Sequence, residues 1–133
     1  AKGKSVGINI KLKHRQKLNK YVIESREFQY FYVRKTMLSF ASKIYVFFPG
    51  GFGTLDEFFE MIMLVQTEKL PRIPIILVDK DYWGPLIKWI EECLFKKNSA
   101  VSKKDLQIYY LVDNADQAHQ LIKKLIKENK VPF

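Results

Sequence analysis

Short runs of consecutive apolar residues alternate along this chain with longer segments of helical periodicity. Residues 44–48 read IYVFF and residues 75–78 read IILV, and each run precedes a segment with apolar residues at every third or fourth position. A strand that is apolar at consecutive positions is typically buried on both faces, as in a parallel sheet covered by helices. The pattern therefore predicts an α/β fold with a mainly parallel sheet in three layers, helix, sheet and helix.

The same kind of pattern predicts the remaining strands and helices. Further strands are predicted at 5–10, 27–32 and 108–112, and residues 11–24 are expected to form mostly a loop. Helices are predicted at 34–42, 54–68 and 82–95, and a last helix follows a cap at Asp113 or Asn114. In the helix at 54–68 the expected buried face consists of Leu55, Phe58, Phe59, Ile62, Met63 and Val65.

Length and composition narrow the class of protein. The chain has 133 residues, of which 47% are hydrophobic, so we expect one domain spanning residues 1–133 with a substantial core. The single cysteine, Cys93, excludes an internal disulfide framework and a cysteine-based zinc cluster. The apolar runs are far shorter than the roughly 20 residues of a membrane helix. The first residues lack the apolar centre of a secretory signal, so we expect a cytoplasmic protein.

Positive charge is concentrated near the beginning of the chain. The formal net charge is +9, and residues 1–26 contain eight basic residues against one acidic residue, Glu24. Such a segment attracts phosphates, including those of nucleic acid. A solvated, lysine-rich surface is the simpler interpretation, because nucleic-acid interfaces usually contain more arginine and a docking module. Nucleic acid and membrane are therefore not among the expected partners.

A glycine-rich turn follows the apolar run at 44–48. Residues 49–57 read PGGFGTLDE and lead into a predicted helix. Glycines permit a positive φ and a close approach of the backbone to a ligand, and a helix N-terminus favours anions. The turn therefore predicts a phosphate site, although it matches neither the dinucleotide fingerprint nor the P-loop. The alternative is a simple tight turn in which Thr54 caps the helix and Glu57 completes a capping box.

These residues resemble the PGGxGTxxE signature of the LOG family of nucleoside 5′-monophosphate phosphoribohydrolases, long labelled "lysine decarboxylase-like". Residues 34–38, RKTML, are similar to the family's Arg-Lys-x-x-Met helix start, at a similar separation from Glu57. The resemblance extends from about residue 5 to the final helix and implies a Rossmann-like fold. It also implies that the chain begins inside the family's domain, so the sheet is expected to be incomplete at its N-terminus.

The resemblance implies a reaction as well as a fold. The family hydrolyses the N-glycosidic bond of a nucleoside 5′-monophosphate, here an AMP-like, GMP-like or cytokinin ribotide, to a free base and ribose 5-phosphate. Glu57 is implied as the catalytic carboxylate and Arg34 as the catalytic cation. These residue types suit an oxocarbenium-like transition state and an anionic substrate. The implied phosphate-binding and substrate-binding residues are Lys35, Gly50, Gly51, Gly53 and Thr54.

Glu60 lies one helical turn after Glu57, so the two carboxylates could share a face and divide the acid and base roles. The alternative for Glu60 is a solvated helix residue. We expect no cofactor and no metal, because His14 and His119 have no plausible ligand partners and the chain is too short for a pyridoxal phosphate decarboxylase.

The resemblance also implies a homodimer or a larger homo-oligomer. A non-catalytic nucleotide-binding or cofactor-binding carrier of the same fold remains the alternative function.

Overall fold

A computed structural model describes residues 3–11 and 19–131 of the chain. The chain forms two compact units, Ala1–Ser42 and Lys43–Phe133, and each is described by itself. The single domain predicted for residues 1–133 stays a prediction. His14 and its basic neighbours Lys13, Arg15 and Lys17 lie outside the described residues.

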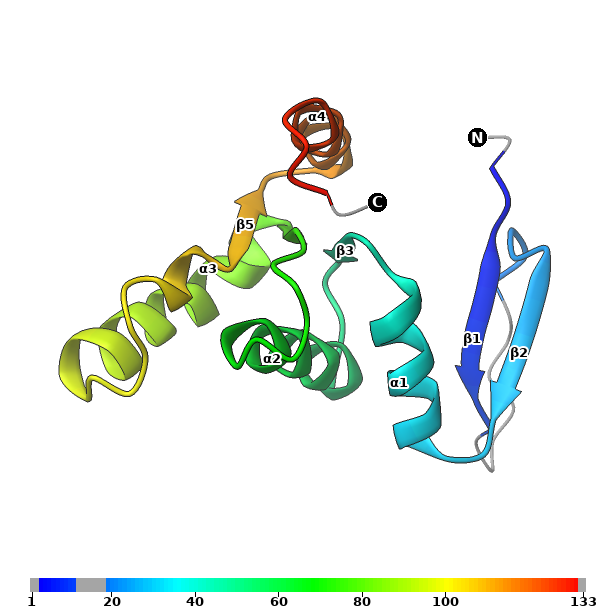
Figure 1. The fold of residues 1–133 in the computed structure, drawn as a ribbon, viewed down its shortest axis with the longest axis horizontal. Helices are drawn as coiled ribbons and strands as arrows, with labels where there is room; N and C mark the ends of the chain where they lie inside the picture. Colours follow the sequence, from blue (N-terminus) through cyan, green and yellow to red (C-terminus); the bar gives the residue numbers. More distant parts are fainter. Residues whose placement is uncertain (1–2, 12–18, 132–133) are drawn as a thin grey trace. The chain divides into compact units, whose positions relative to one another are not determined.

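The described residues of the first unit form two parallel strands and one helix (Figure 1). Strand β1 (Val6–Ile10) pairs with β2 (Glu24–Phe28), with Val6 opposite Glu24, and helix α1 spans Phe31–Ala41. The strand predicted at 5–10 is confirmed. The strand predicted at 27–32 is wrong in its bounds, because the helix already begins at Phe31. Aromatic residues favour strands only where they fit a half-buried pleated surface, and here Phe31 and Tyr32 are exposed at the start of α1.

The second unit is built on a three-stranded parallel sheet. Strands β3 (Tyr45–Phe47), β4 (Ile75–Val78) and β5 (Tyr109–Val112) lie in the order β3-β4-β5. Helices α2 (Phe52–Gln66) and α3 (Lys80–Trp89) follow the first two strands, and α4 (Ala115–Lys127) follows the third (Figure 1). The predicted Rossmann-like alternation of parallel strands and helices is confirmed.

Strand β4 is buried at every position because helices cover both faces of this sheet. Ile75 and Leu77 belong to a core cluster with side chains of α2 and α3, including Phe58 and Trp83. Ile76 and Val78 belong to a second cluster with side chains of α4. Successive residues of a strand point to opposite faces, so the second unit has the three layers that the sequence predicts.

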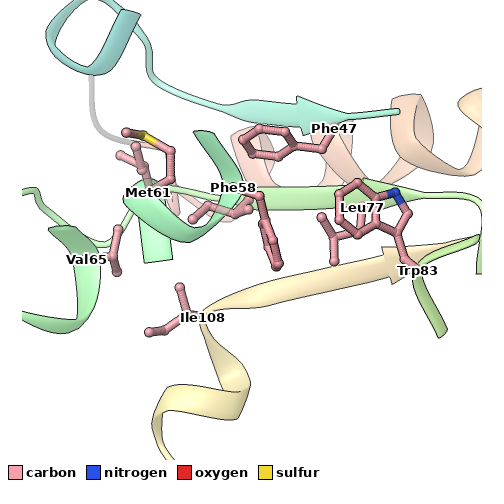
Figure 2. Close-up of a cluster of buried hydrophobic side chains, with 9 residues drawn as sticks. Phe47, Phe58, Met61, Val65, Leu77, Trp83 and Ile108 are labelled. Atoms are coloured by element: carbon pink, nitrogen blue, oxygen red, sulfur yellow. The ribbon is translucent and has the colours of Figure 1, made fainter. Parts of the chain in front are cut away.

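Phe58 of α2 is at the centre of the first cluster (Figure 2). Its ring centroid lies 5.7 Å from that of Phe47, 5.2 Å from that of Trp83 and 5.9 Å from that of Tyr109. All three contacts have the edge-to-face geometry that aromatic pairs prefer. The ring of Phe58 therefore joins α2 to β3, α3 and β5.

The predicted buried face of α2 is partly wrong. Phe58, Met61 and Val65 are its buried residues, whereas Phe59 and Met63 are exposed. Residues 58, 61 and 65 follow the helical repeat along one face, and residues 59 and 63 lie on the neighbouring face. Both faces are apolar, so periodicity alone did not separate them.

The single α-helix predicted at 82–95 is also a correction. Helix α3 ends at Trp89 and continues as a π-helical segment, Ile90–Lys97. Within this segment Lys96 Nζ lies 2.8 Å from Glu91 Oε1, an ion pair five residues apart that suits the wider turn. The hydrogen bond and charge of Lys96 lower the pKa of the Glu91 carboxyl.

No helix in the described part of the chain is both long enough and apolar enough to cross a bilayer. The cytoplasmic location stays a prediction.

We predict that Phe58→Ala lowers the free energy of unfolding by about 3–5 kcal/mol, because it leaves a cavity beneath three aromatic rings. Phe52→Ala is the matched control, since Phe52 lies in the same helix and is 92% exposed, and it should change stability by no more than about 0.5 kcal/mol. Urea unfolding monitored by circular dichroism measures both. Equal effects of the two substitutions would contradict the assigned core.

Candidate functional site

The carboxyl ends of β3, β4 and β5 lie at one edge of the sheet, because the three strands are parallel. Ligands of open α/β sheets bind outside this edge. The segments that follow the three strands begin at Phe48, Asp79 and Asp113. The glycine-rich turn therefore lies where this fold places a ligand.

Helix α2 begins directly after the two adjacent glycines. Gly51 is its N-cap, with φ −97° and ψ −158°, and as a glycine it has no side chain that could cap this end. The amides of Thr54 and Leu55 both donate to the Gly51 carbonyl oxygen, at 3.0 and 3.1 Å. The amides of Gly51, Phe52 and Gly53 precede these bonds and lack acceptors within the helix, which is the arrangement that binds anions.

The capping box considered for Thr54 and Glu57 is wrong. Thr54 is the third residue of α2 rather than its cap, and its side chain is half-buried. The helix begins two residues earlier than predicted because Gly51, in an extended conformation, already supplies the first carbonyl acceptor. Thr54 shares a helix face with Phe58, so its side chain belongs to the inner side of the turn.

One of the two uses predicted for the glycines, a positive φ, is not observed. No glycine in the described ranges has a positive φ. A Cβ added at Gly50 would overlap the Thr54 hydroxyl and lie 2.8 Å from the Thr54 Cβ, so Gly50 is required for close packing within the turn. A Cβ at Gly51 or Gly53 would meet no atom within 4 Å. The α-carbons of these two glycines therefore face open space.

Gly53, Glu57 and Glu60 recur at the i, i+4 and i+7 positions of α2 and share one face. Both glutamates are half-buried on this face. Along the helix, Glu57 comes about one turn after Gly53, and Glu60 comes about one turn after Glu57. A ligand anion bound at the helix N-terminus would extend toward them if it lay along this face.

Arg34 and Lys35 lie in α1 of the first unit, and both are half-buried. The Arg34 Nε donates to the Ile8 carbonyl oxygen at 3.0 Å, which ties this side chain to the middle of β1. The structure therefore fixes Arg34 within its own unit. The approach of Arg34 and Lys35 to Glu57 stays a prediction.

The sequence analysis missed two residues at the edge of the sheet, Asp79 and Tyr82. Asp79 has φ 92° and ψ 95°, a conformation that costs a non-glycine residue about 1–3 kcal/mol. Its carboxylate accepts from the amides of Asp81 and Tyr82, at 3.1 and 3.2 Å, and so caps α3. The Tyr82 hydroxyl donates to the Gly50 carbonyl oxygen at 2.5 Å. The position of Asp79 directly after a buried strand was the available signal.

The end of β5 is held by polar contacts. Asp113 lies 3.0 Å from Lys80 Nζ and accepts from the Gln117 amide nitrogen at 2.9 Å. The hydrogen bonds from Lys80 and Gln117 lower the pKa of the Asp113 carboxyl. Of the two predicted caps of α4, Asn114 is the one observed, because its side chain accepts from the Gln117 backbone amide.

A cavity of about 500 Å³ lies at the opposite edge of the sheet. Its lining includes Ile73 and Pro74, which precede β4, and Gln107 and Ile108, which precede β5. It is therefore at the amino ends of the strands and is separate from the glycine-rich turn. Among the described residues, no group of three or more histidine, cysteine, aspartate or glutamate side chains could hold a metal ion.

We predict opposite effects on stability for two alanine substitutions in the turn. Gly50→Ala should lower the free energy of unfolding by about 1–3 kcal/mol, because the new methyl group overlaps Thr54. Gly53→Ala should raise it by up to about 1 kcal/mol, because Gly53 is helical and its added methyl group meets open space. Urea unfolding distinguishes the two, and a destabilised Gly53→Ala protein would contradict the open face.

Comparisons with known proteins identify relatives of the chain. The family model described as "Possible lysine decarboxylase" matches residues 1–122. A probable cytokinin riboside 5′-monophosphate phosphoribohydrolase of Oryza sativa subsp. japonica is 30% identical over 93 residues, 69% of this chain and 39% of the relative. A cytokinin riboside 5′-monophosphate phosphoribohydrolase of Rhodococcoides fascians is 31% identical over 58 residues, 44% of this chain and 29% of the relative.

The matched regions thus span well under half the length of these two curated relatives. The family match, by contrast, extends over most of this chain and includes the glycine-rich turn, α1 and α2. The chain therefore belongs to the family described as possible lysine decarboxylases, which is the LOG family.

Proposed function

We propose that this chain hydrolyses the N-glycosidic bond of a nucleoside 5′-monophosphate, releasing a free base and ribose 5-phosphate. The observation that carries the proposal is the shared face of Gly53, Glu57 and Glu60, which starts at an uncapped helix N-terminus on the carboxyl edge of the sheet. The names of the two relatives, cytokinin riboside 5′-monophosphate phosphoribohydrolases, support the same reaction with a cytokinin ribotide as substrate.

The spacing on α2 suits a nucleotide. In the proposed complex the 5′-phosphate accepts hydrogen bonds from the amides of Gly51, Phe52 and Gly53. Glu57 follows Gly53 by one turn, about 6 Å along the helix axis. A sugar attached to this phosphate would lie over the second turn, beside the Glu57 carboxylate. The phosphate thus anchors a remote part of the substrate and positions the bond that breaks.

The chemistry assigns a role to each charged group. The bond between C1′ and the base nitrogen breaks, and its electron pair leaves with the base. The Glu57 carboxylate stabilises the positive charge that develops on the sugar. A water molecule adds to C1′, and its proton passes through a carboxylate to the nitrogen of the leaving base, with Glu60 as the candidate partner of Glu57. Arg34 supplies a guanidinium for the phosphate or the leaving base, and Lys35 supplies a further substrate contact.

One observation favours a second function. The glycine-rich turn and the start of α2 lie entirely within the second unit, so anion binding there does not require Arg34. A non-catalytic carrier of a nucleotide or nucleotide-like cofactor would need only this half of the site. Measuring the release of free base distinguishes the hydrolase from the carrier.

We predict that Glu57→Gln lowers kcat for base release at least about 100-fold while changing nucleotide affinity less than about threefold, because the lost charge acts mainly in the transition state. Arg34→Ala should impair both turnover and affinity. Chromatography of AMP, GMP and a cytokinin ribotide after incubation measures free base, and calorimetry measures binding. Both measurements use the full-length protein that the gene encodes.

Glu92→Gln is the matched control, since Glu92 is an exposed glutamate on the π-helical segment, away from α2. It should retain wild-type turnover and affinity. Near-normal turnover in Glu57→Gln would contradict the assigned carboxylate. Nucleotide binding without base release by the wild-type protein would favour the carrier.

We also propose that the protein is a homodimer or a larger homo-oligomer that associates through α2. Phe52, Phe59 and Met63 recur on one face of this helix and are 92%, 40% and 52% exposed. Large apolar side chains gathered on one face mark interaction surfaces. A second copy of the chain would bury this face beside the glycine-rich turn.

The double substitution Phe59→Lys with Met63→Lys should convert the assembly to monomers, because it places charges in the apolar face. Light scattering after size-exclusion chromatography measures the mass. Trp89→Lys is the control, since Trp89 is an exposed aromatic residue on α3, and it should leave the mass unchanged. A wild-type monomer at all protein concentrations would exclude the homo-oligomer.

A further inference from the structure

The direction of one peptide group decides whether the glycine-rich turn can donate to an anion. The Gly50–Gly51 peptide is trans, and in a planar trans peptide the carbonyl and the amide point in opposite directions. The direction of the Gly50 carbonyl therefore sets the direction of the Gly51 N–H. Two adjacent glycines leave this peptide unusually free to rotate, so the turn needs an outside contact to hold it.

Tyr82 makes that contact. Its hydroxyl donates to the Gly50 carbonyl oxygen at 2.5 Å, from the first turn of α3 to the turn before α2. The carbonyl is thereby directed toward α3, and the Gly51 N–H points away from α3. Thr54 occupies the space where a Gly50 side chain would lie, so Gly50 is confined by two contacts.

The neighbours of Tyr82 hold its ring in place. The ring lies edge-on to that of Trp83, with centroids 5.0 Å apart and planes at 81°. Trp83 is fully buried beside Leu77, near the carboxyl ends of the strands (Figure 2). Its Nε1 has no hydrogen-bond partner among the described residues, so packing alone anchors it. The Asp79 carboxylate holds the Tyr82 amide at 3.2 Å.

We propose that Tyr82 is a positioning residue for the phosphate site of this protein, which consists of the amides of Gly51, Phe52 and Gly53. Its hydroxyl holds the Gly50–Gly51 peptide in the one orientation that presents the Gly51 amide to a phosphate. This inference rests on the proposed function for the identity of the anion, a 5′-phosphate. It adds that the β4–α3 junction, outside the signature motif, determines affinity for the phosphate end of the substrate.

The inference predicts a selective loss. Tyr82→Phe removes the hydroxyl and keeps the ring against Trp83. The Gly50–Gly51 peptide is then free to rotate, and the Gly51 N–H points away from the phosphate site for part of the time. Affinity for phosphate should fall about tenfold, because this factor corresponds to the free energy of one hydrogen bond. KM for a nucleoside 5′-monophosphate should rise by the same factor, while kcat stays within about threefold because Glu57 is untouched.

The experiment compares Tyr82→Phe with Tyr110→Phe in the complete gene product. The two tyrosines are 37% and 38% exposed, and Tyr110 lines the cavity at the opposite edge. Amide NMR spectra are recorded while inorganic phosphate and then ribose 5-phosphate are added, and the shift of the Gly51 amide gives each Kd. Base release from AMP and from adenosine gives kcat and KM, and resonances outside the turn verify the fold.

The proposal is supported if Tyr82→Phe raises both the Kd for phosphate and the KM for AMP about tenfold, and if Tyr110→Phe changes neither. A wild-type Gly51 amide that does not respond to phosphate overturns the inference, as does an unchanged Kd in Tyr82→Phe. An equal loss of activity on adenosine also overturns it, because adenosine has no phosphate. If the wild-type protein releases no base but Tyr82→Phe weakens phosphate binding, the proposed function fails and the positioning role stands.

Discussion

The coverage of β4 on both faces is the constraint from which the rest of the second unit follows. All four residues of Ile75–Val78 are buried, and a strand can be buried in this way only when helices cover each side of the sheet. The connections between parallel strands must then cross over the sheet as helices, which directs every strand to the same edge. The start of α2 is consequently placed beside the ends of β4 and β5, where Tyr82 can reach the glycine-rich turn.

The sequence predicted what depends on burial and was less successful where several local conformations satisfy the same pattern. The strand at 75–78 was predicted to the residue, because four consecutive β-branched or leucine residues suit few other structures. The aromatic segment around Phe31 and Tyr32 suited a strand or a helix start, and only the fold decides between them. The change from α-helix to π-helix at Ile90 leaves no mark in the spacing of apolar residues.

The candidate site, too, was predicted only in part. The placement of Gly50, Gly51 and Gly53 at a helix N-terminus followed from the motif and from the buried strand before it. The cap did not, because the T-x-x-E pattern of a helix start is present here inside the helix, after a glycine that already serves as the cap. Tyr82 could not be found by local reasoning, since its hydrogen bond to Gly50 joins residues 32 positions apart. Contacts of this range are set by topology, and propensity contains no information about them.

The division of the implied site between two units has a consequence for catalysis. The second unit alone contains the first amides of α2, the two half-buried glutamates and Tyr82, whose hydroxyl donates to the Gly50 carbonyl oxygen. The side chains that follow the turn along the shared face of α2 are the carboxylates of Glu57 and Glu60, which disfavours a second anionic group and favours a group that becomes positive, such as a sugar losing its base. The cation Arg34 comes from the first unit, where its Nε is already bound to Ile8. Anion binding at the turn can therefore be a property of one unit, whereas the proposed bond cleavage would use residues of both, and this distinguishes the proposed carrier from the proposed hydrolase.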